Sequence, residues 1–186
     1  LRRRRASVLS SIRVAMPKAR RWSVLAVLLS CPATRDVEHG RGGRQGLFHS
    51  DSHSVALRDL REAACEALSF FAPFHARLVG PVLSGTADRH SAVCLHLFSD
   101  EVESVLAFLT DQGIPFTETS RRLRMTRDDY QDMPVMEILA DGVPFDLTIL
   151  PRDAQRHPPL DRIDEKPMAG ASLHAVRSLL TEAGAE

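Results

Sequence analysis

Two neighbouring side chains, Cys94 and His96, are the first candidates for chemistry in this chain of 186 residues. Sulfur and imidazole ligands suit zinc, and His90 would be a third ligand. The same two side chains could form a cysteine nucleophile and its base. Neither interpretation is favoured, because Cys94 and His96 stand at i and i+2 of one extended stretch and no second ligand pair or orienting group accompanies them.

A second candidate is the segment from Pro81 to Ser91, which is rich in small polar residues and is predicted to be a loop. Its centre, Ser84-Gly85-Thr86, could hold a phosphate through backbone N–H groups or could be an ordinary tight connection. The glycine-rich stretch over residues 40–46 does not match a phosphate-binding loop, because no Gly-Lys-Ser/Thr follows it. Residues 40–46 are interpreted as a flexible linker.

Charged residues on the later strands form the third group. Asp146 could be a metal ligand, or a strand aspartate that is hydrogen-bonded near a sheet edge. The basic cluster Arg121, Arg122 and Arg124 could contact a phosphate or an acidic partner, although a solvated strand face is the simpler interpretation. His157 is expected at the surface.

Hydrophobic periodicity predicts the elements that position these residues. The predicted elements are a helix over 51–71, strands over 76–80 and 92–98, a helix between Ser99 and Gly113, extended structure over 114–125, strands over 134–140 and 143–150, an extended loop over 151–170 and a helix from Ser172. Helix N-caps are expected at Asp51 or Ser52, at Ser99 and at Ser172. The order of elements predicts an α/β or α+β fold with a mixed sheet and flanking helices.

Charge divides the chain into two parts. Residues 1–50 carry a formal charge of +9 and residues 51–186 carry −9, so the net charge of zero hides a basic arm on an acidic body. We expect the first 50 residues to be a poorly ordered arm and linker, and residues 51–186 to form one domain. The sequence contains no specific signal for nucleic-acid binding.

Three cysteines at wide spacings exclude a disulfide framework and a zinc finger, and their usage favours the cytoplasm. The apolar stretch over residues 22–29 is far shorter than the roughly 20 residues that span a bilayer. It could instead be the apolar region of a signal peptide, with Cys31 as a lipoprotein anchor. An envelope lipoprotein is therefore the alternative location, and the only one of these interpretations that involves a membrane.

The stretch from Leu78 to Leu95 resembles the signature of the nucleotidyltransferase superfamily of the DNA polymerase beta type. In that signature, a strand ends in Gly-Ser, a second glycine follows, and the next strand opens with Ser-Asp-x-Asp. The residues of this chain that match it are Gly80, Gly85, Ser91, Val93, Leu95 and, as the third acid on a later strand, Asp146. The longer segment from Phe48 to Leu180 is similar to small bacterial proteins of unassigned role.

The resemblance implies a nucleotidyltransferase-like core in which three carboxylates would hold two divalent cations. Ala92 and Cys94 stand where the paired aspartates of that family would be. Alanine offers no ligand and a thiol suits Mg²⁺ poorly, so Asp146 would be a single remnant ligand at most.

Two functions follow from this resemblance. The first is a nucleotide-binding or protein-binding domain without turnover, with Gly80, Ser84, Gly85, Thr86 and Ser91 as its nucleotide-binding residues. The alternative is an active Mg²⁺-dependent nucleotidyltransferase with a rearranged site. In that case Asp146 would act with an acid from elsewhere, the candidates being Asp88, Asp100 and Glu137.

Overall fold

A computed structural model describes residues 50–161 and 165–182 of the chain. The predicted basic arm, the linker over residues 40–46 and Cys31 lie outside these residues, and so do the side chains of the predicted first caps, Asp51 and Ser52. Within the described part, no helix is both long enough and apolar enough to cross a bilayer.

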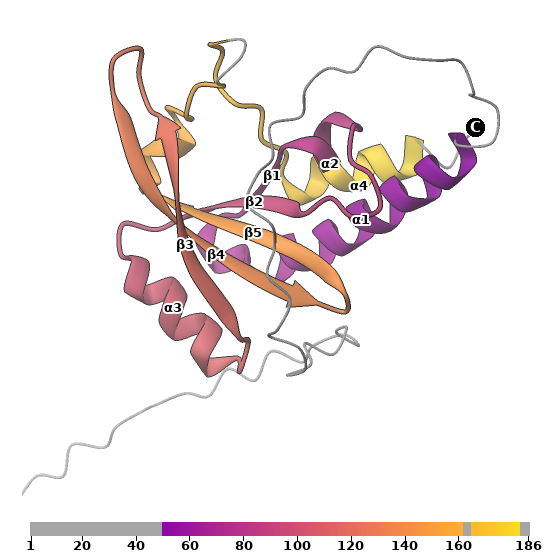
Figure 1. Ribbon diagram of the computed structural model, residues 1–186, viewed down its shortest axis with the longest axis horizontal. Helices are drawn as coiled ribbons and strands as arrows, with labels where there is room; N and C mark the ends of the chain where they lie inside the picture. The colour runs from indigo at the N-terminus through magenta and orange to yellow at the C-terminus, as the bar shows by residue number, and fades with distance from the viewer. Residues whose placement is uncertain (1–49, 162–164, 183–186) are drawn as a thin grey trace, which may run out of the picture.

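The described elements confirm the predicted α/β class (Figure 1). The helices are α1 (Ser50–Phe70), α2 (Pro81–Ser84), α3 (Val102–Asp111) and α4 (Leu173–Glu182), with the 3₁₀ turns η1 (Ala72–Phe74) and η2 (Arg152–Gln155). The strands are β1 (Arg77–Val79), β2 (Val93–Phe98), β3 (Phe116–Arg124), β4 (Tyr130–Ala140) and β5 (Val143–Leu150).

The five strands form one mixed sheet in the order β1-β2-β5-β4-β3. Only β2 and β5 run parallel, and every other neighbouring pair is antiparallel. A parallel pair requires a long crossover. Here the crossover contains α3, β3 and β4, so β5 returns to the middle of the sheet between β2 and β4.

The two faces of β2 have different surroundings. Val93, Leu95 and Leu97 point to one face and are fully buried in the main hydrophobic core. That core also includes the apolar sides of α1, α3 and α4, and α1 and α4 lie against each other (Figure 1). Cys94 and His96 point to the other face, because successive strand residues alternate.

Three predicted boundaries are wrong, the first in the loop after β1. The predicted loop over residues 81–91 begins with the short helix α2. Pro81 at its first position favours a helical start, and Gly85 closes it in a left-handed conformation with φ +82°. The predicted extended loop over residues 151–170 likewise begins with a helical turn, η2, in which Ala154 is buried.

The second error is the N-cap of α3, which is Glu101 and not Ser99. Ser99 remains tied to the sheet, since its N–H donates to the carbonyl of Leu150 over 2.9 Å. The helix therefore begins later than the sequence indicates. Ser172 does act as predicted, because its hydroxyl accepts the N–H of Ala175 at 3.5 Å.

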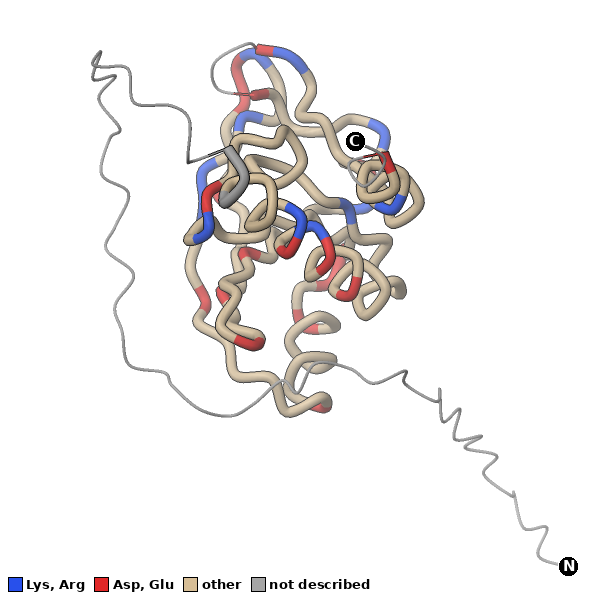
Figure 2. Tube along the Cα trace, turned by 90° about the vertical axis from the view of Figure 1, so that its right-hand side faces the viewer, with Lys and Arg blue, Asp and Glu red and all other residues tan. Residues whose placement is uncertain are grey.

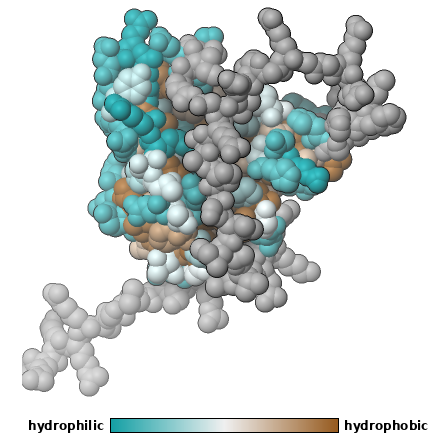
Figure 3. All heavy atoms as spheres, in the orientation of Figure 1, coloured by the Kyte–Doolittle hydropathy of each residue, from teal (hydrophilic) through white to brown (hydrophobic). Residues whose placement is uncertain are grey.

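The third error is the start of β4, which begins at Tyr130 and not at Pro134. The first part of β4 pairs only with β3, and pairing with β5 starts at Val135. Pro134 is therefore accommodated just before β4 joins β5, where its missing N–H leaves no ladder bond unmade. The long β3–β4 hairpin that results carries mainly hydrophilic atoms at the upper left of Figure 3.

The predicted hairpin turn between β4 and β5 is confirmed. Asp141 and Gly142 both have positive φ, +50° and +81°, as a two-residue turn of this kind requires. A Cβ on Gly142 would meet nothing within 4 Å, so the requirement at this position is conformational and not steric packing.

We expect Gly142→Ala to lower the free energy of unfolding by about 1 kcal/mol, because alanine resists positive φ. Urea unfolding followed by circular dichroism measures the change. Asp141→Asn is the matched control, since asparagine tolerates this conformation, and it should leave stability within about 0.5 kcal/mol. An alanine variant as stable as the parent protein would show that the turn does not constrain the hairpin.

Candidate functional site

Asp146 lies near the centre of the sheet, between Cys94 and Glu137. It is the register partner of Cys94 across the parallel β2–β5 pair and of Glu137 across the antiparallel β4–β5 pair. Paired positions share a face, so the three side chains project to the side of the sheet opposite the main core. The expectation that Asp146 is near a sheet edge is wrong, because β5 is the middle strand.

Arg121 joins this group from β3 and neutralises Asp146. Its Nη2 donates to Oδ2 of Asp146 at 2.7 Å, in an ion pair whose side chains are 45% and 20% exposed. Burial alone would lower the pKa of Arg121, but Asp146 outweighs it and the net shift is upward. We name Cys94, Glu137, Asp146 and Arg121 the Asp146 cluster.

Cys94 is an unreactive member of the cluster. Burial raises the pKa of its thiol, the nearby charge of Asp146 raises it further, and Arg121 opposes both. The thiol stays protonated at neutral pH and is a weak nucleophile. Its S–H points to the carbonyl of Ala92 at 3.7 Å.

The Gly80–Ser91 loop begins beside the Asp146 cluster. A Cβ on Gly80 would lie 3.6 Å from both Cβ and Sγ of Cys94, and Gly80 has φ +74°. At the other end of the loop, the hydroxyl of Ser91 donates to Oδ1 of Asp88 at 3.0 Å and accepts the Asp88 N–H at 2.9 Å. The N–H of His90 and the hydroxyl of Ser91 lower the pKa of Asp88. Ser91 therefore closes an internal turn.

The centre of the loop directs its backbone donors inward. The N–H of Ser84 donates to the carbonyl of Gly80, and those of Gly85 and Thr86 donate to Pro81. The Ser84 and Thr86 hydroxyls are 2.9 Å apart and share a hydrogen bond. The Ser84 hydroxyl also donates to the carbonyl of Pro81 at 3.3 Å, so in this conformation the backbone and hydroxyl donors at the centre of the loop are bonded within the loop.

Helix α1 holds the loop in place. Nε of Arg61 donates to the carbonyl of Val82 at 3.2 Å, and its Nη2 donates to Leu83 at 3.4 Å. A Cβ on Gly85 would lie 3.6 Å from the same guanidinium group. Arg61 therefore fixes the first half of the loop against α1.

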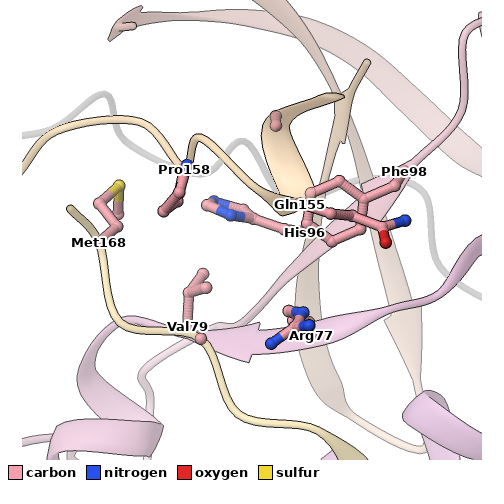
Figure 4. Close-up of a pocket in the computed structure, with 9 residues that line it drawn as sticks. Arg77, Val79, His96, Phe98, Gln155, Pro158 and Met168 are labelled. Carbon is pink, nitrogen blue, oxygen red and sulfur yellow. The ribbon is translucent and has the colours of Figure 1, made fainter. Parts of the chain in front are cut away.

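A small pocket lies on the same face of the sheet as the cluster, farther along β2 (Figure 4). It has a volume of about 50 Å³ and is bounded by β1, β2, η2 and the segment before α4. The imidazole of His96 points into it, toward Pro158 and Met168. Arg77 and Gln155 supply its other polar groups.

His96 is 5% exposed, and no hydrogen bond in the described part of the chain involves its ring. Burial, and secondarily the positive charge of Arg121, lower the pKa of His96 from 6.5 to about 4. The imidazole is therefore neutral at pH 7.

The described residues contain no group of three His, Cys, Asp or Glu side chains that could hold a metal ion. Two of the acids suggested as partners for Asp146 have other partners. Asp88 accepts the N–H of His90 within the Gly80–Ser91 loop, and Asp100 accepts the N–H of Arg152 at 3.0 Å. Only Glu137 stands next to Asp146 in the sheet.

The partner of Asp146 is not evident from the sequence, where Arg121, Arg122 and Arg124 form one basic cluster. The surroundings of these three arginines differ in the folded chain. Arg121 pairs with Asp146, and Arg124 pairs with Glu165 at 2.8 Å. The alternation of a strand was the available signal, since it separates Arg121 from its two neighbours.

The sequence matches no family model and no curated protein. Function must therefore be argued from the Asp146 cluster, the adjoining loop and the pocket. Charge is unevenly distributed over the described body. In Figure 2 the lowest part carries Asp and Glu without Lys or Arg, whereas both signs occur in the upper part.

We expect His96 to make stability depend on pH. Its folded pKa lies below the unfolded value, so the unfolded chain binds the proton more tightly and stability is lost as pH falls from about 6.5 to about 4. The loss approaches about 3 kcal/mol at the lower limit. His96→Leu should lack this component in urea unfolding measured across the range. The control is His174→Gln, an exposed histidine, and equal pH slopes for the parent protein and His96→Leu would contradict the assignment.

Proposed function

We propose that this protein binds a nucleotide at the Asp146 cluster and the Gly80–Ser91 loop, and that it acts by binding without turnover. In this proposal, residues 51–186 form a nucleotidyltransferase-like core whose metal site is degenerate. The arrangement of the sheet supports this, since the glycine-containing loop joins β1 to β2 and Asp146 stands on the strand beside β2. The resemblance of the sequence implied the same arrangement.

The observation that carries the proposal is the ion pair between Arg121 and Asp146. A two-metal site needs several carboxylates whose negative charge is balanced by the cations. Here the carboxylate of Asp146 is already paired with a guanidinium group at 2.7 Å, Glu137 is the one other carboxylate beside it in the sheet, and Ala92 and Cys94 add no side-chain oxygen ligand. A metal cation at Asp146 would have to displace Arg121 or bind against the repulsion of its positive charge.

Arg121 can also recognise the ligand. A guanidinium group has five N–H donors in a planar fork that matches phosphate oxygens. One nitrogen, Nη2, faces Asp146, and the side chain is 45% exposed, so donors remain accessible. The hydroxyls of Ser84 and Thr86 could add neutral donors only by exchanging their bonds within the loop for bonds to the ligand. Mg²⁺ would arrive bound to the nucleotide phosphates and not to a preformed protein site.

A thermal-shift panel of nucleoside mono-, di- and triphosphates, each with and without Mg²⁺ or Mn²⁺, tests the proposal. A ligand that binds the native state raises the melting temperature, by an amount that corresponds to about 2.7 kcal/mol at 100 times the dissociation constant. We expect at least one nucleotide to raise it, and the increase to be lost in Arg121→Met. The increase is compared within each variant, so a change in the ligand-free stability does not affect the result.

Arg127→Met is the matched control, because this exposed arginine lies at the tip of the β3–β4 hairpin, away from the cluster. Arg127→Met should show the same nucleotide-dependent increase in melting temperature as the parent protein. If no nucleotide raises the melting temperature of the parent protein, the nucleotide part of the proposal is rejected and a protein-binding role remains.

The second candidate, an active enzyme with a rearranged site, is favoured by one observation. Glu137 faces Asp146 directly across β4 and β5, so two carboxylates stand at neighbouring positions. For both to hold one Mg²⁺ ion with bonds of about 2.0–2.1 Å, Arg121 would have to move away from Asp146.

We expect no pyrophosphate release from nucleoside triphosphates with Mg²⁺ or Mn²⁺ above the background of Asp146→Asn. Two carboxylates with a bound guanidinium group do not provide a two-metal centre. Turnover by the parent protein that disappears in both Glu137→Gln and Asp146→Asn would establish the enzyme and overturn the binding-only proposal.

A further inference from the structure

The two edges of the sheet are protected to different extents. At the β1 edge, Leu78 and Ala171 exchange both backbone hydrogen bonds, at 2.9 and 2.8 Å. The segment before α4 thus covers this three-residue strand. The other edge is β3, which has nine residues and lies at the left of the sheet in Figure 1.

Among residues 50–161 and 165–182, only those at the end of β3 have a backbone partner on the outer side of the strand. The N–H of Leu160 donates to the carbonyl of Arg124 at 2.7 Å, which shows that the backbone groups of Arg124 face away from β4. Successive residues of a strand direct these groups to alternate sides. The backbone N–H and C=O of Glu118, Ser120 and Arg122 therefore face outward as well.

These outward groups have no protein partner in the described part of the chain. No backbone hydrogen bond outside the β3–β4 ladder involves Glu118, Ser120 or Arg122, and all three residues are exposed. A long open edge with unpaired N–H and C=O groups is a template for another strand.

We propose that β3 pairs antiparallel with β3 of a second copy of this chain, across a two-fold axis at Ser120. In this register, Glu118 of each copy stands directly opposite Arg122 of the other, and Ser120 faces its own equivalent. The three outward residues of each copy then satisfy their backbone groups across the interface, and the two sheets continue as one.

Charge identifies the occupant as a second copy. Glu118 and Arg122 lie two residues before and two residues after Ser120, so an antiparallel pair brings opposite charges together twice. Neither side chain forms an ion pair within the described chain, and Arg122 stacks over Tyr130 at 5.3 Å, which positions it near the edge.

The same charges oppose two other registers. An axis at Glu118 would place two glutamates opposite each other, and an axis at Arg122 would do the same with two arginines. Pairing also ends where Leu160 occupies the carbonyl of Arg124, which limits the shared ladder to the stretch from Glu118 to Arg122. So short an interface predicts a weak dimer that forms as concentration rises.

Sedimentation velocity of the full chain over a concentration series, without nucleotide, tests this inference, which does not depend on the proposed function. The parent protein should show a reversible monomer–dimer equilibrium. Glu118→Arg and Arg122→Glu should each weaken dimerisation about tenfold or more, because each creates like-charge pairs in both halves of the interface. The double variant Glu118→Arg/Arg122→Glu restores opposite charges and should recover the dimer.

Two further variants complete the design. Arg177→Glu, a charge reversal at an exposed residue of α4, which packs on α1 and on β1 at the opposite edge of the sheet, should leave the equilibrium unchanged. Ser120→Pro removes an outward N–H at the axis but no bond to β4, and should abolish the dimer while circular dichroism shows a folded chain. A parent protein that stays monomeric throughout, or a dimer that the single charge reversals do not weaken, overturns the proposal.

Discussion

The parallel pairing of β2 with β5 is the constraint on which the rest of this structure depends. It places residue 94 beside residue 146 and residue 96 beside residue 148, across two strands separated by a long crossover. One face of this pair is apolar and is covered by the helices, so its burial stabilises the arrangement. The other face carries the Asp146 cluster toward one end of the pair and a second, smaller apolar cluster with Phe98 and Leu150 at the other end. The candidates for function lie on this face or at its edge.

A single guanidinium group sets the electrostatics of that polar face. Arg121 balances Asp146 through a short ion pair, and its charge also disfavours protonation of His96. Cys94, beside the same pair, keeps its proton chiefly because it is buried. A bound cation can be released and can exchange its water ligands, whereas an arginine can do neither. The guanidinium group also keeps its charge at any physiological pH. In the binding role that we propose, an anionic ligand would be held by the accessible donors of Arg121, and not by a net positive charge of the cluster, which contains two carboxylates.

The segment between β5 and α4 links the polar face to the edges of the sheet. Pro158 and Met168 form one wall of the pocket at His96, while Leu160 and Ala171 cover parts of β3 and β1. This coverage stops short of the middle of β3. The open stretch carries charged residues, which oppose indiscriminate strand addition and permit only a partner with matching charges.

The order of elements, the tight turn at Asp141-Gly142 and the Ser172 cap could all be predicted from the amino-acid sequence. These depend on hydrophobic period and on local backbone preferences within a few residues. It also indicated Asp146 and the loop after β1, but not what surrounds them. Arg121 is 25 residues from Asp146 in the chain. Their meeting required β5 to insert between β2 and β4, which no local pattern encodes. The charge that Asp146 faces depends on strand order and register, because these bring residues that are distant in the chain onto one face of the sheet.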